Sequence, residues 1–202
     1  MNSMPYIDYL IYAAHTAFWL AFGVTRMATA RPRTVEETPG SAAAAGSEGV
    51  AFARTAVAIH MVAFAVMYFG LGQAVIPHAV PTWFVGQRLA GFGVILLGAV
   101  LASWAVASFQ SWRFQAKLDA GHQLATGGPF RYLRHPIYAA LNLLALGSAV
   151  WVPTMALWIA FGLMVIGSEV RARLEERLLH RAFGQTYADY SLRTKRFIPG
   201  IY

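Results

Sequence analysis

The chain has 202 residues, of which 57% are hydrophobic and 12% are charged, and its net charge is +7. This length fits one domain, and the composition excludes an ordinary soluble protein because the apolar residues come in blocks too long for a buried core helix. The sequence has no cysteine, which excludes disulfides, a thiolate nucleophile and a cysteine metal site. No nucleic acid partner is expected, because membrane topology explains the basic excess better.

Three apolar segments, residues 6–25, 51–76 and 84–109, are each long enough to cross the hydrocarbon core as a helix. The first lacks the basic start and the cleavage site of a signal peptide, so we interpret it as a retained span. Between the spans, residues 36–49 are small, polar and turn-rich and predict a flexible linker. Residues 77–81 predict a short hairpin connection.

Residues 137–167 are apolar throughout but are interrupted by Trp151-Val152-Pro153. We predict a tight hairpin of two helices, 137–150 and 154–167, both short for a full crossing. The expected fold class is therefore all-α, an integral membrane bundle of about five transmembrane helices with a cytosolic loop and a helical tail. We expect one domain over residues 1–202, with three spans in 1–109 and the loop, hairpin and tail in 110–202.

The positions of the basic residues test this topology, because cytoplasmic loops collect lysine and arginine. They gather in the first loop with its flanks, in residues 110–136, and in the tail after Val170, and only Arg88 lies near the other side. If the N-terminus is outside, five helices bring the three basic regions to one face. The sequence therefore predicts a multi-pass membrane protein with this face in the cytoplasm.

Ionisable residues inside the spans are candidates for functional sites. Asp8, His78 and Arg88 lie near predicted helix ends, where snorkelling to the interface explains them. His15 and His60 are predicted to hydrogen-bond within the bundle, and no metal is expected because no pair of ligands has a suitable spacing. The glycines of the third span are predicted to permit close helix packing. They are Gly86, Gly91, Gly93 and Gly98.

The segment Gly128–Tyr138 is a cationic, aromatic loop that leads directly into an apolar helix. Arg131, Arg134 and His135 lie at the entry to that helix, and Pro136 suits its first turn, where the missing N–H is not needed. A helix start beside cationic side chains makes a local anion site. The alternative is an arginine-rich anchor at the lipid headgroups.

Residues 169–183 predict a helix that ends at Gly184. Its predicted apolar face consists of Leu174, Leu178, Leu179 and Ala182. The opposite, self-paired face consists of Glu169, Arg173, Glu176 and His180. Glu175 projects within the apolar face, where a carboxylate needs a partner or a ligand. A salt bridge from Glu175 to Arg131 or Arg134 is the purely structural alternative.

Together these segments resemble the isoprenylcysteine carboxyl methyltransferase family and its relatives, the phospholipid N-methyltransferases. The matching motifs are His122–Tyr138, Glu175-Glu176, Phe183–Tyr190 and Arg196–Pro199. The resemblance covers the part of the chain after the third span. It implies a membrane enzyme that binds S-adenosylmethionine in a pocket on the cytoplasmic face, and a lipophilic acceptor that reaches this pocket through the membrane.

The resemblance also implies roles for individual residues. The residues expected to surround the cofactor are His122, Leu124, Ala125, Gly128, Tyr132, His135 and Tyr138. Glu175, with or without Glu176, is expected to bind the polar groups of the cofactor. Arg134 and Arg193 are expected at the substrate end of the pocket.

The residue types agree with methyl transfer, an in-line displacement for which the protein aligns the reactants and excludes water. A carboxylate such as Glu175 can bind a ribose diol or an amino group, and His135 can meet the carboxylate of the cofactor. An acceptor carboxylate can be held by Arg134 or Arg193. An amine acceptor would instead need a base, for which Glu176 is the only obvious candidate.

Two alternatives remain at this stage besides transfer to a phospholipid amine. Membrane sterol reductases that use NADPH share a similar Arg-His-Pro loop and a basic, aromatic tail. The Glu175-Glu176 pair and the short, five-span length favour the methyltransferase. A membrane scaffold without enzymatic activity is the other alternative, and it predicts no stabilisation by either cofactor.

Overall fold

The computed structural model describes residues 5–29, 47–75, 85–108 and 124–202. The three helices before residue 109 are α1 (Pro5–Ala28), α2 (Ser47–Val75) and α3 (Val85–Ser108). They are followed by the 3-10 turn η2 (Gly128–Arg131), α4 (Pro136–Trp151), α5 (Met155–Phe183) and α6 (Gln185–Arg193). The expected all-α class is confirmed, since the described ranges hold no strand beyond one isolated bridge between Leu133 and Lys195.

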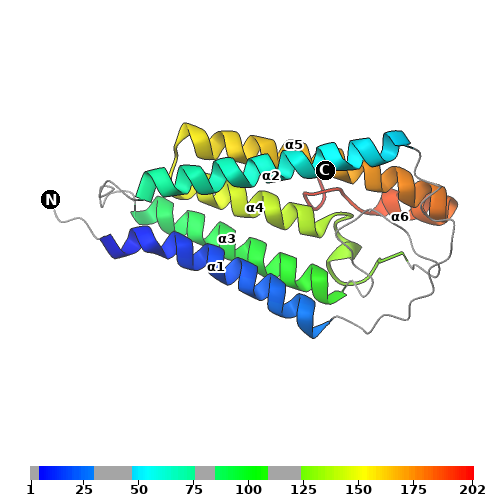
Figure 1. The fold of residues 1–202 in the computed structure, drawn as a ribbon. Helices are drawn as coiled ribbons and strands as arrows, with labels where there is room; N and C mark the ends of the chain where they lie inside the picture. The colour runs from blue at the N-terminus through cyan, green and yellow to red at the C-terminus, as the bar shows by residue number, and fades with distance from the viewer. Residues whose placement is uncertain (1–4, 30–46, 76–84, 109–123) are drawn as a thin grey trace.

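The five long helices form one bundle in which successive helices run in opposite directions (Figure 1). Helix α1 packs on α3, α3 on α4, α4 on α5 and α5 on α2. The turn η2, the start of α4, helix α6 and the C-terminal segment therefore lie at the same end of the bundle (Figure 1). Apart from Arg88, the described basic residues lie toward this end, as the charge pattern predicts.

The predicted first three spans agree with α1, α2 and α3 to within a few residues. Three of the described helices are long and apolar enough to cross a membrane: α3, α5 and residues 54–73 of α2. Helix α4 is apolar but shorter, as predicted. The linker prediction for 36–49 lies outside the described residues except for its last three, which begin α2, and the connection at 77–81 lies outside them.

The second helix of the hairpin differs from the prediction. Helix α5 runs without a break from Met155 to Phe183, through both predicted helices (154–167 and 169–183), and spans 29 residues. Gly167 and Ser168 at the junction are buried against α2, so tertiary packing holds this stretch helical although its glycine lowers local helix propensity. The predicted tail helix is therefore an extension of the last apolar helix. Gly184 ends it, with a φ of +50° and its N–H donating to the His180 carbonyl.

Helices α3 and α4 meet through bare glycine backbone. A Cβ on Gly91 would lie 2.7 Å from the Gly147 carbonyl, and one on Gly98 would lie 3.0 Å from the Ala140 carbonyl. The packing role is thus confirmed for Gly91 and Gly98, since a Cβ at either position would press against the backbone of α4. It is wrong for Gly86 and Gly93, whose missing side chains would meet open space. This contact fixes α4, and with it the loop that precedes α4.

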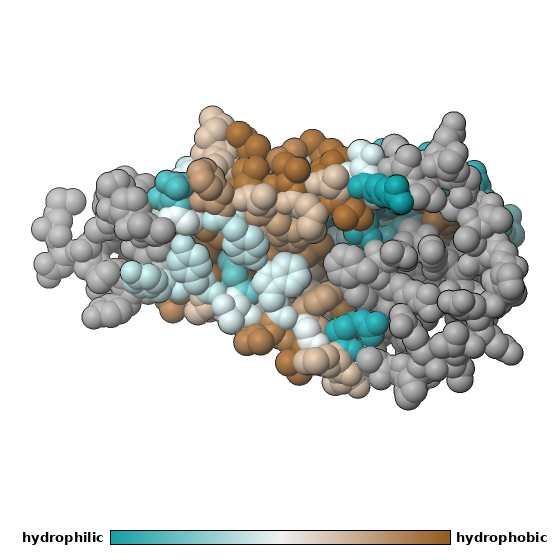
Figure 2. Space-filling view, viewed as in Figure 1, coloured by the Kyte–Doolittle hydropathy of each residue, from teal (hydrophilic) through white to brown (hydrophobic). Residues whose placement is uncertain are grey.

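The outer surface of the bundle is apolar. Hydrophobic residues cover much of the upper part of the described face in Figure 2, and exposed examples from α1, α2, α3 and α5 are Leu20, Phe69, Leu97, Val100 and Ile166. Lipid chains are the solvent that such a surface requires. The chain is an integral membrane protein.

The buried histidines are hydrogen-bonded inside the bundle, as predicted. His15 Nε2 lies 2.9 Å from Ser148 Oγ, and His60 Nε2 lies 3.4 Å from Ser168 Oγ. Arg88 differs from the prediction, because its side chain is buried in the first turn of α3 rather than extended toward the interface. The side chain of Asp8 and all of His78 lie outside the described residues.

Candidate active site

The loop that carries the Arg-His-Pro sequence is folded onto the end of α3. Gly128 starts η2 with a φ of +57°, and a Cβ there would overlap the Ser108 side chain and lie 3.2 Å from Trp104 Nε1. Glycine is therefore required twice, for its conformation and for its size. Phe130 then packs into an apolar cluster with Ala105 and Val106 of α3, which fixes the loop on the bundle.

The C-terminal segment, at residues 195–196, is joined to the same loop by backbone hydrogen bonds. The Arg134 N–H donates to the Lys195 carbonyl at 2.7 Å, and the His135 N–H donates to the Arg196 carbonyl at 3.2 Å. The Lys195 N–H donates back to the Tyr132 carbonyl at 3.2 Å. Helix α4 begins at Pro136, as predicted, so these backbone hydrogen bonds hold His135 at the start of that helix.

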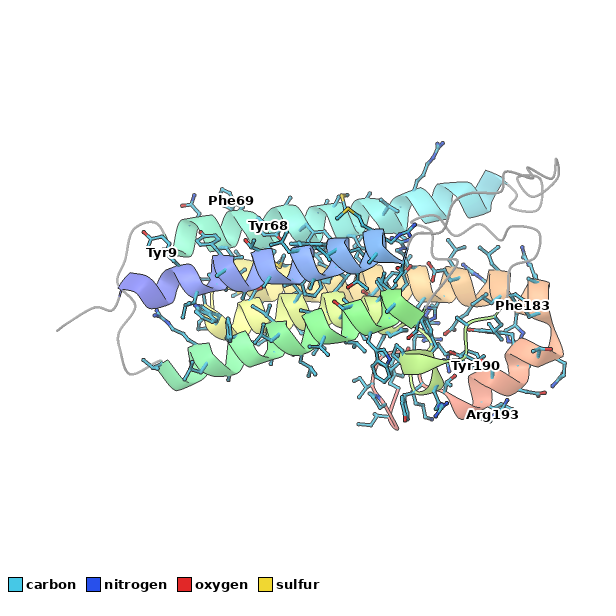
Figure 3. The ribbon with its side chains drawn as sticks, turned by 90° about the horizontal axis from the view of Figure 1, so that it is seen from below. Tyr9, Tyr68, Phe69, Phe183, Tyr190 and Arg193 are labelled. Carbon is cyan, nitrogen blue, oxygen red and sulfur yellow. The ribbon has the colours of Figure 1, made fainter. Side chains whose placement is uncertain are left out.

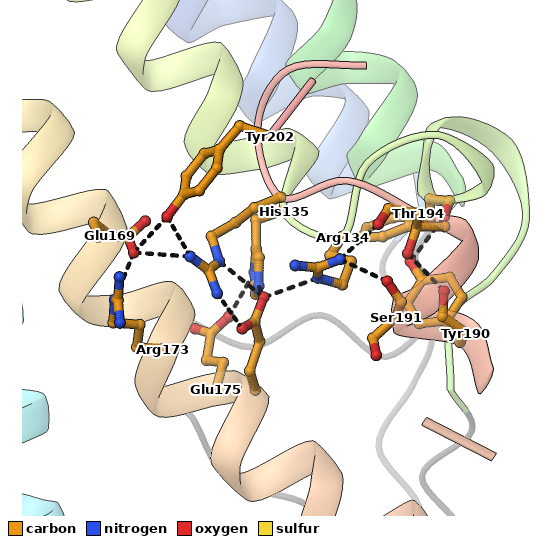
Figure 4. Close-up of polar contacts among 12 residues, drawn as sticks. Arg134, His135, Glu169, Arg173, Glu175, Tyr190, Ser191, Thr194 and Tyr202 are labelled. Carbon is orange, nitrogen blue, oxygen red and sulfur yellow. Dashed lines mark hydrogen bonds and ion pairs between the residues drawn. The ribbon is translucent and has the colours of Figure 1, made fainter. Parts of the chain in front are cut away.

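Glu175 of α5 faces this helix start (Figure 4). It accepts a hydrogen bond from the Tyr138 hydroxyl, and its Oε2 lies 3.5 Å from His135 Nδ1. The Arg171 guanidinium is farther away, 3.9 Å from Oε1, and lies over the Tyr138 ring. Glu175 thus has one direct hydroxyl partner and two longer contacts.

Glu176 has closer cationic partners than Glu175. Arg134 Nε donates to its Oε1 at 2.9 Å, and Arg196 donates to both oxygens at 3.0 and 2.7 Å. His135 Nε2 lies 3.2 Å from Oε1. Arg134 also donates through Nη1 to the carbonyls of Ser191 and Thr194, which ties the loop to the end of α6. Glu176 therefore joins the loop, α5 and the C-terminal segment.

The structure excludes one alternative for these acids and contradicts one expectation. The alternative of a salt bridge from Glu175 to Arg131 or Arg134 is not formed, because Arg134 pairs with Glu176, and Arg131 lies exposed at the end of η2. Glu176 is not on a self-paired outer face either, since the folded loop and tail cover that side of α5. The Glu169–Arg173 pair on that face does form, although Glu169 also pairs with Arg196. Ala182, expected in the apolar face, is exposed.

The two acids control the protonation of His135. Burial lowers the pKa of this imidazole, but hydrogen bonds and charge from Glu175 and Glu176 outweigh burial and raise the pKa above its ordinary value. Glu176 likewise raises the pKa of Arg196. Burial raises the pKa of Tyr190 to about 12, so its hydroxyl remains a donor, to the Phe130 carbonyl at 2.8 Å. The site is a compact set of alternating opposite charges.

The structure thus brings together a subset of the predicted site residues: Arg134, His135, Tyr138, Glu175 and Glu176. Leu124, Ala125 and Gly128 lie in the half-buried stretch that leads to the loop, with Ala125 packed against the cluster at the end of α3. Tyr132 and Arg193 are exposed, and Arg193 Nε donates to the Asp189 carbonyl. His122 lies outside the described residues.

Sequence reasoning missed the roles of two arginines in this cluster. Arg171 precedes Glu175 by four residues, so the spacing of neighbours on one helix face could have indicated their contact. Arg196 pairs with Glu176, 20 residues earlier in the chain, because the C-terminal segment folds back on the loop, and no local pattern reveals this. In the part of the chain that the structure describes, no group of three histidine, aspartate or glutamate side chains could hold a metal.

Comparison of the sequence with known proteins finds similarity to methyltransferases. Residues 87–186 match the model of the phospholipid methyltransferase family. Protein-S-isoprenylcysteine O-methyltransferase B of Arabidopsis thaliana is 28% identical over 116 residues, 55% of this chain and 58% of the relative. A probable protein-S-isoprenylcysteine O-methyltransferase of Oryza sativa subsp. indica is 28% identical over 123 residues, 59% of this chain and 63% of that relative. The aligned part thus covers less than two thirds of either relative.

The fold and the site define a class, that of helical integral membrane proteins with an ionised site between a cationic loop and the end of the last long helix. Within this class, residues 87–186 are similar to the phospholipid methyltransferase family. The matched residues run from α3 into α6, and thus include the loop, α4 and both acids of α5.

Proposed function

We propose that the protein is a membrane methyltransferase that uses S-adenosylmethionine and transfers its methyl group to a carboxylate or thiol of a lipophilic molecule. The observation that carries the proposal is the meeting of His135 with Glu175 and Glu176, 40 and 41 residues farther along the chain, at the start of an apolar helix. The family match supports methyl transfer rather than NADPH-dependent reduction.

The polar groups at this junction fit the proposed cofactor. Glu175 offers carboxylate oxygens to a ribose diol or an amino group, and its contacts with His135 and Arg171 are long enough to exchange for a ligand. The buried hydroxyl of Tyr187 has no hydrogen-bond partner among the described residues, and burial followed by Glu176 raises its pKa, so it remains a donor. A buried donor without a partner is costly, and a ligand can supply one.

Glu175 and Glu176 have different roles in this proposal. Glu175, with fewer close partners, is assigned to the cofactor, and Glu176 is assigned to holding the loop, α5 and the tail together. Three cationic side chains surround Glu176 and stabilise its ionised form, which makes it a weak proton acceptor. This argues against Glu176 as a general base and favours an acceptor that is already anionic.

The bound cofactor supplies an electrophilic sulfonium methyl group, and the residues of the chain orient the reactants. The bonds of Arg134 use its Nε–H and Nη1, so the Nη2 amino group is the part that can hold an acceptor carboxylate. Tyr138 and His135, stacked with ring centroids 5.7 Å apart, form an aromatic wall beside Glu175 that excludes water. Arg193, exposed on α6, is a second cation for an acceptor that approaches from the surface.

The family match gives transfer to a phospholipid amine as the second candidate. The products separate the candidates, since alkali releases a methyl ester as methanol, whereas an S-methyl or an N-methyl group survives and is identified from the product. The excess of arginine at the site end of the bundle supports a cytoplasmic location for the site.

Radiolabelled methyl transfer tests the proposal. Purified protein, S-adenosylmethionine with a labelled methyl group and a total lipid and small-molecule extract are incubated, and the labelled product is then treated with alkali. We expect label in an apolar product, released by alkali as methanol if the acceptor is a carboxylate and retained as a thioether if it is a thiol, and no label with Glu175→Gln. Alkali-stable label would indicate a thiol or an amine acceptor, which identification of the product as a thioether or an N-methyl amine separates, and absence of label with every extract would count against methyl transfer.

A further inference from the structure

Two buried histidines at different positions along the bundle make similar contacts, each with a serine of another helix. His15 of α1 bonds Ser148 of α4, and His60 of α2 bonds Ser168 of α5, and both rings are almost fully buried. His15 also contacts Tyr68, which lies far along the bundle from Tyr190 of the site end (Figure 3). His60 lies nearer the proposed site, next to Tyr138.

His60 is held on three sides. Its Nδ1 donates to the Ala56 carbonyl of its own helix at 3.0 Å, and its Nε2 lies near Ser168. Ser168 donates to Asn142 Oδ1 at 2.9 Å, which links the group to α4. A Cβ on Gly167 would lie 2.8 Å from His60 Nδ1, so the ring occupies space that only glycine leaves free on α5.

The ring of His60 is next to Tyr138. Their centroids are 6.1 Å apart, with the planes tilted by 37°. Tyr138 is the residue whose hydroxyl donates to Glu175 and whose ring also stacks on His135. The position of the Tyr138 ring is therefore fixed between a loop histidine and a histidine of α2.

We infer that His60 is a positioning residue of the site: it holds the Tyr138 ring so that the hydroxyl and Glu175 keep the geometry that the cofactor needs. This assigns a part of the site to α2, which lies outside the residues that match the family model. Because a shift of a hydrogen-bonding group by a fraction of an ångström weakens a binding site, His60 can act without touching a ligand. The inference rests on the proposed function.

The experiment compares His60→Phe with His15→Phe, each with and without Tyr138→Phe. Each histidine substitution keeps an aromatic ring and removes its hydrogen bonds. Binding of S-adenosylhomocysteine is measured by titration calorimetry, and apparent unfolding temperature is measured without ligand. We expect His60→Phe to weaken binding about tenfold, the factor that corresponds to one misplaced hydrogen bond, while His15→Phe leaves affinity within about twofold. We also expect the unfolding shifts of His60→Phe and Tyr138→Phe to be non-additive, and those of His15→Phe and Tyr138→Phe to add.

The outcomes separate the inference from the proposed function. If the unmodified protein does not bind S-adenosylhomocysteine, the proposed function is refuted, and the double-mutant comparison still tests whether His60 acts through Tyr138. Equal affinity in His60→Phe and His15→Phe, or additive shifts for the His60–Tyr138 pair, would overturn the inference. If His60→Phe does not fold, His60→Gln, which keeps hydrogen-bonding groups without the ring, is expected to fold and to show the same loss of affinity, and unchanged affinity would overturn the inference.

Discussion

Replacing Glu175 or Glu176 by glutamine should affect two different properties, cofactor binding and stability, although the two residues are adjacent. Glu176→Gln removes the charge that Arg134, Arg196 and His135 share, and one oxygen that faces Arg196 becomes an amino group. Glu175→Gln keeps an oxygen for the Tyr138 hydroxyl and loses only two longer contacts. The first change should therefore affect stability, and the second should affect the cofactor.

The size of the stability effect follows from burial. Breaking a fully buried ion pair costs roughly 3–5 kcal/mol, and an exposed pair contributes less than about 1 kcal/mol. The Glu176 side chain is 16% exposed and glutamine retains one acceptor, so we expect a loss of about 2–3 kcal/mol. For a chain of this size that corresponds to a drop of roughly 5–10 °C in unfolding temperature. Glu175→Gln should cost less than about 1 kcal/mol, within the range of exchanges away from close ion pairs.

Thermal unfolding in detergent, followed by intrinsic fluorescence, measures the difference. Arg173→Ala is the matched control, because Arg173 also pairs with a glutamate of α5 but its side chain is 63% exposed. It should change the unfolding temperature only slightly. If Glu176→Gln shifts the temperature no more than Arg173→Ala, or if Glu175→Gln is the more destabilising of the two, the division of roles between the acids is wrong.

Three further predictions concern the bundle, the loop and pH. Gly147→Ala should destabilise the protein by about 2 kcal/mol or more, because the added Cβ would lie 2.7 Å from the Gly91 carbonyl, whereas Gly93→Ala should be neutral or slightly stabilising; thermal unfolding of both tests this. Gly128→Ala should lower the unfolding temperature through its positive φ and its overlap with Ser108, and a normal melting curve would refute the loop geometry. The pKa of His135 is raised on folding, so its contribution to stability is complete below about pH 6.5 and is lost as pH rises through the folded value. The stability advantage of the unmodified protein over His135→Gln should therefore shrink with rising pH, and a constant difference would contradict the pairing with the acids.

Apolar length and helix signals were enough to predict most of the bundle. Hydrocarbon thickness sets the length of a span, so α1, α2 and α3 could be located from composition alone. Pro136 and Gly184 mark the start of α4 and the end of α5 because their backbone requirements are local. The continuity of α5 could not be predicted, since it depends on Gly167 packing against His60 of another helix.

The same distinction between local signals and tertiary packing decides which site residues the sequence could predict. His135 and Glu175 could be identified because each is unusual in its local setting, one at an apolar helix start and the other on an apolar face. The pairing of Glu176 with Arg134 and Arg196 depends on how the C-terminal segment folds back on the loop. A helical wheel gives the direction of a side chain but not what covers it, and the helical pattern alone therefore places Glu176 on an outer face.

Thermal stabilisation by S-adenosylhomocysteine tests the central claim most directly, that the loop and the acids of α5 together bind a methyl-donor cofactor. A ligand at about 100 times its dissociation constant stabilises the folded state by roughly 2.7 kcal/mol, provided that it does not bind the unfolded chain. We expect S-adenosylhomocysteine to raise the unfolding temperature of the unmodified protein and of Arg173→Ala, and not that of Glu175→Gln. Stabilisation by NADPH instead, by neither ligand, or by S-adenosylhomocysteine equally in Glu175→Gln would contradict the claim.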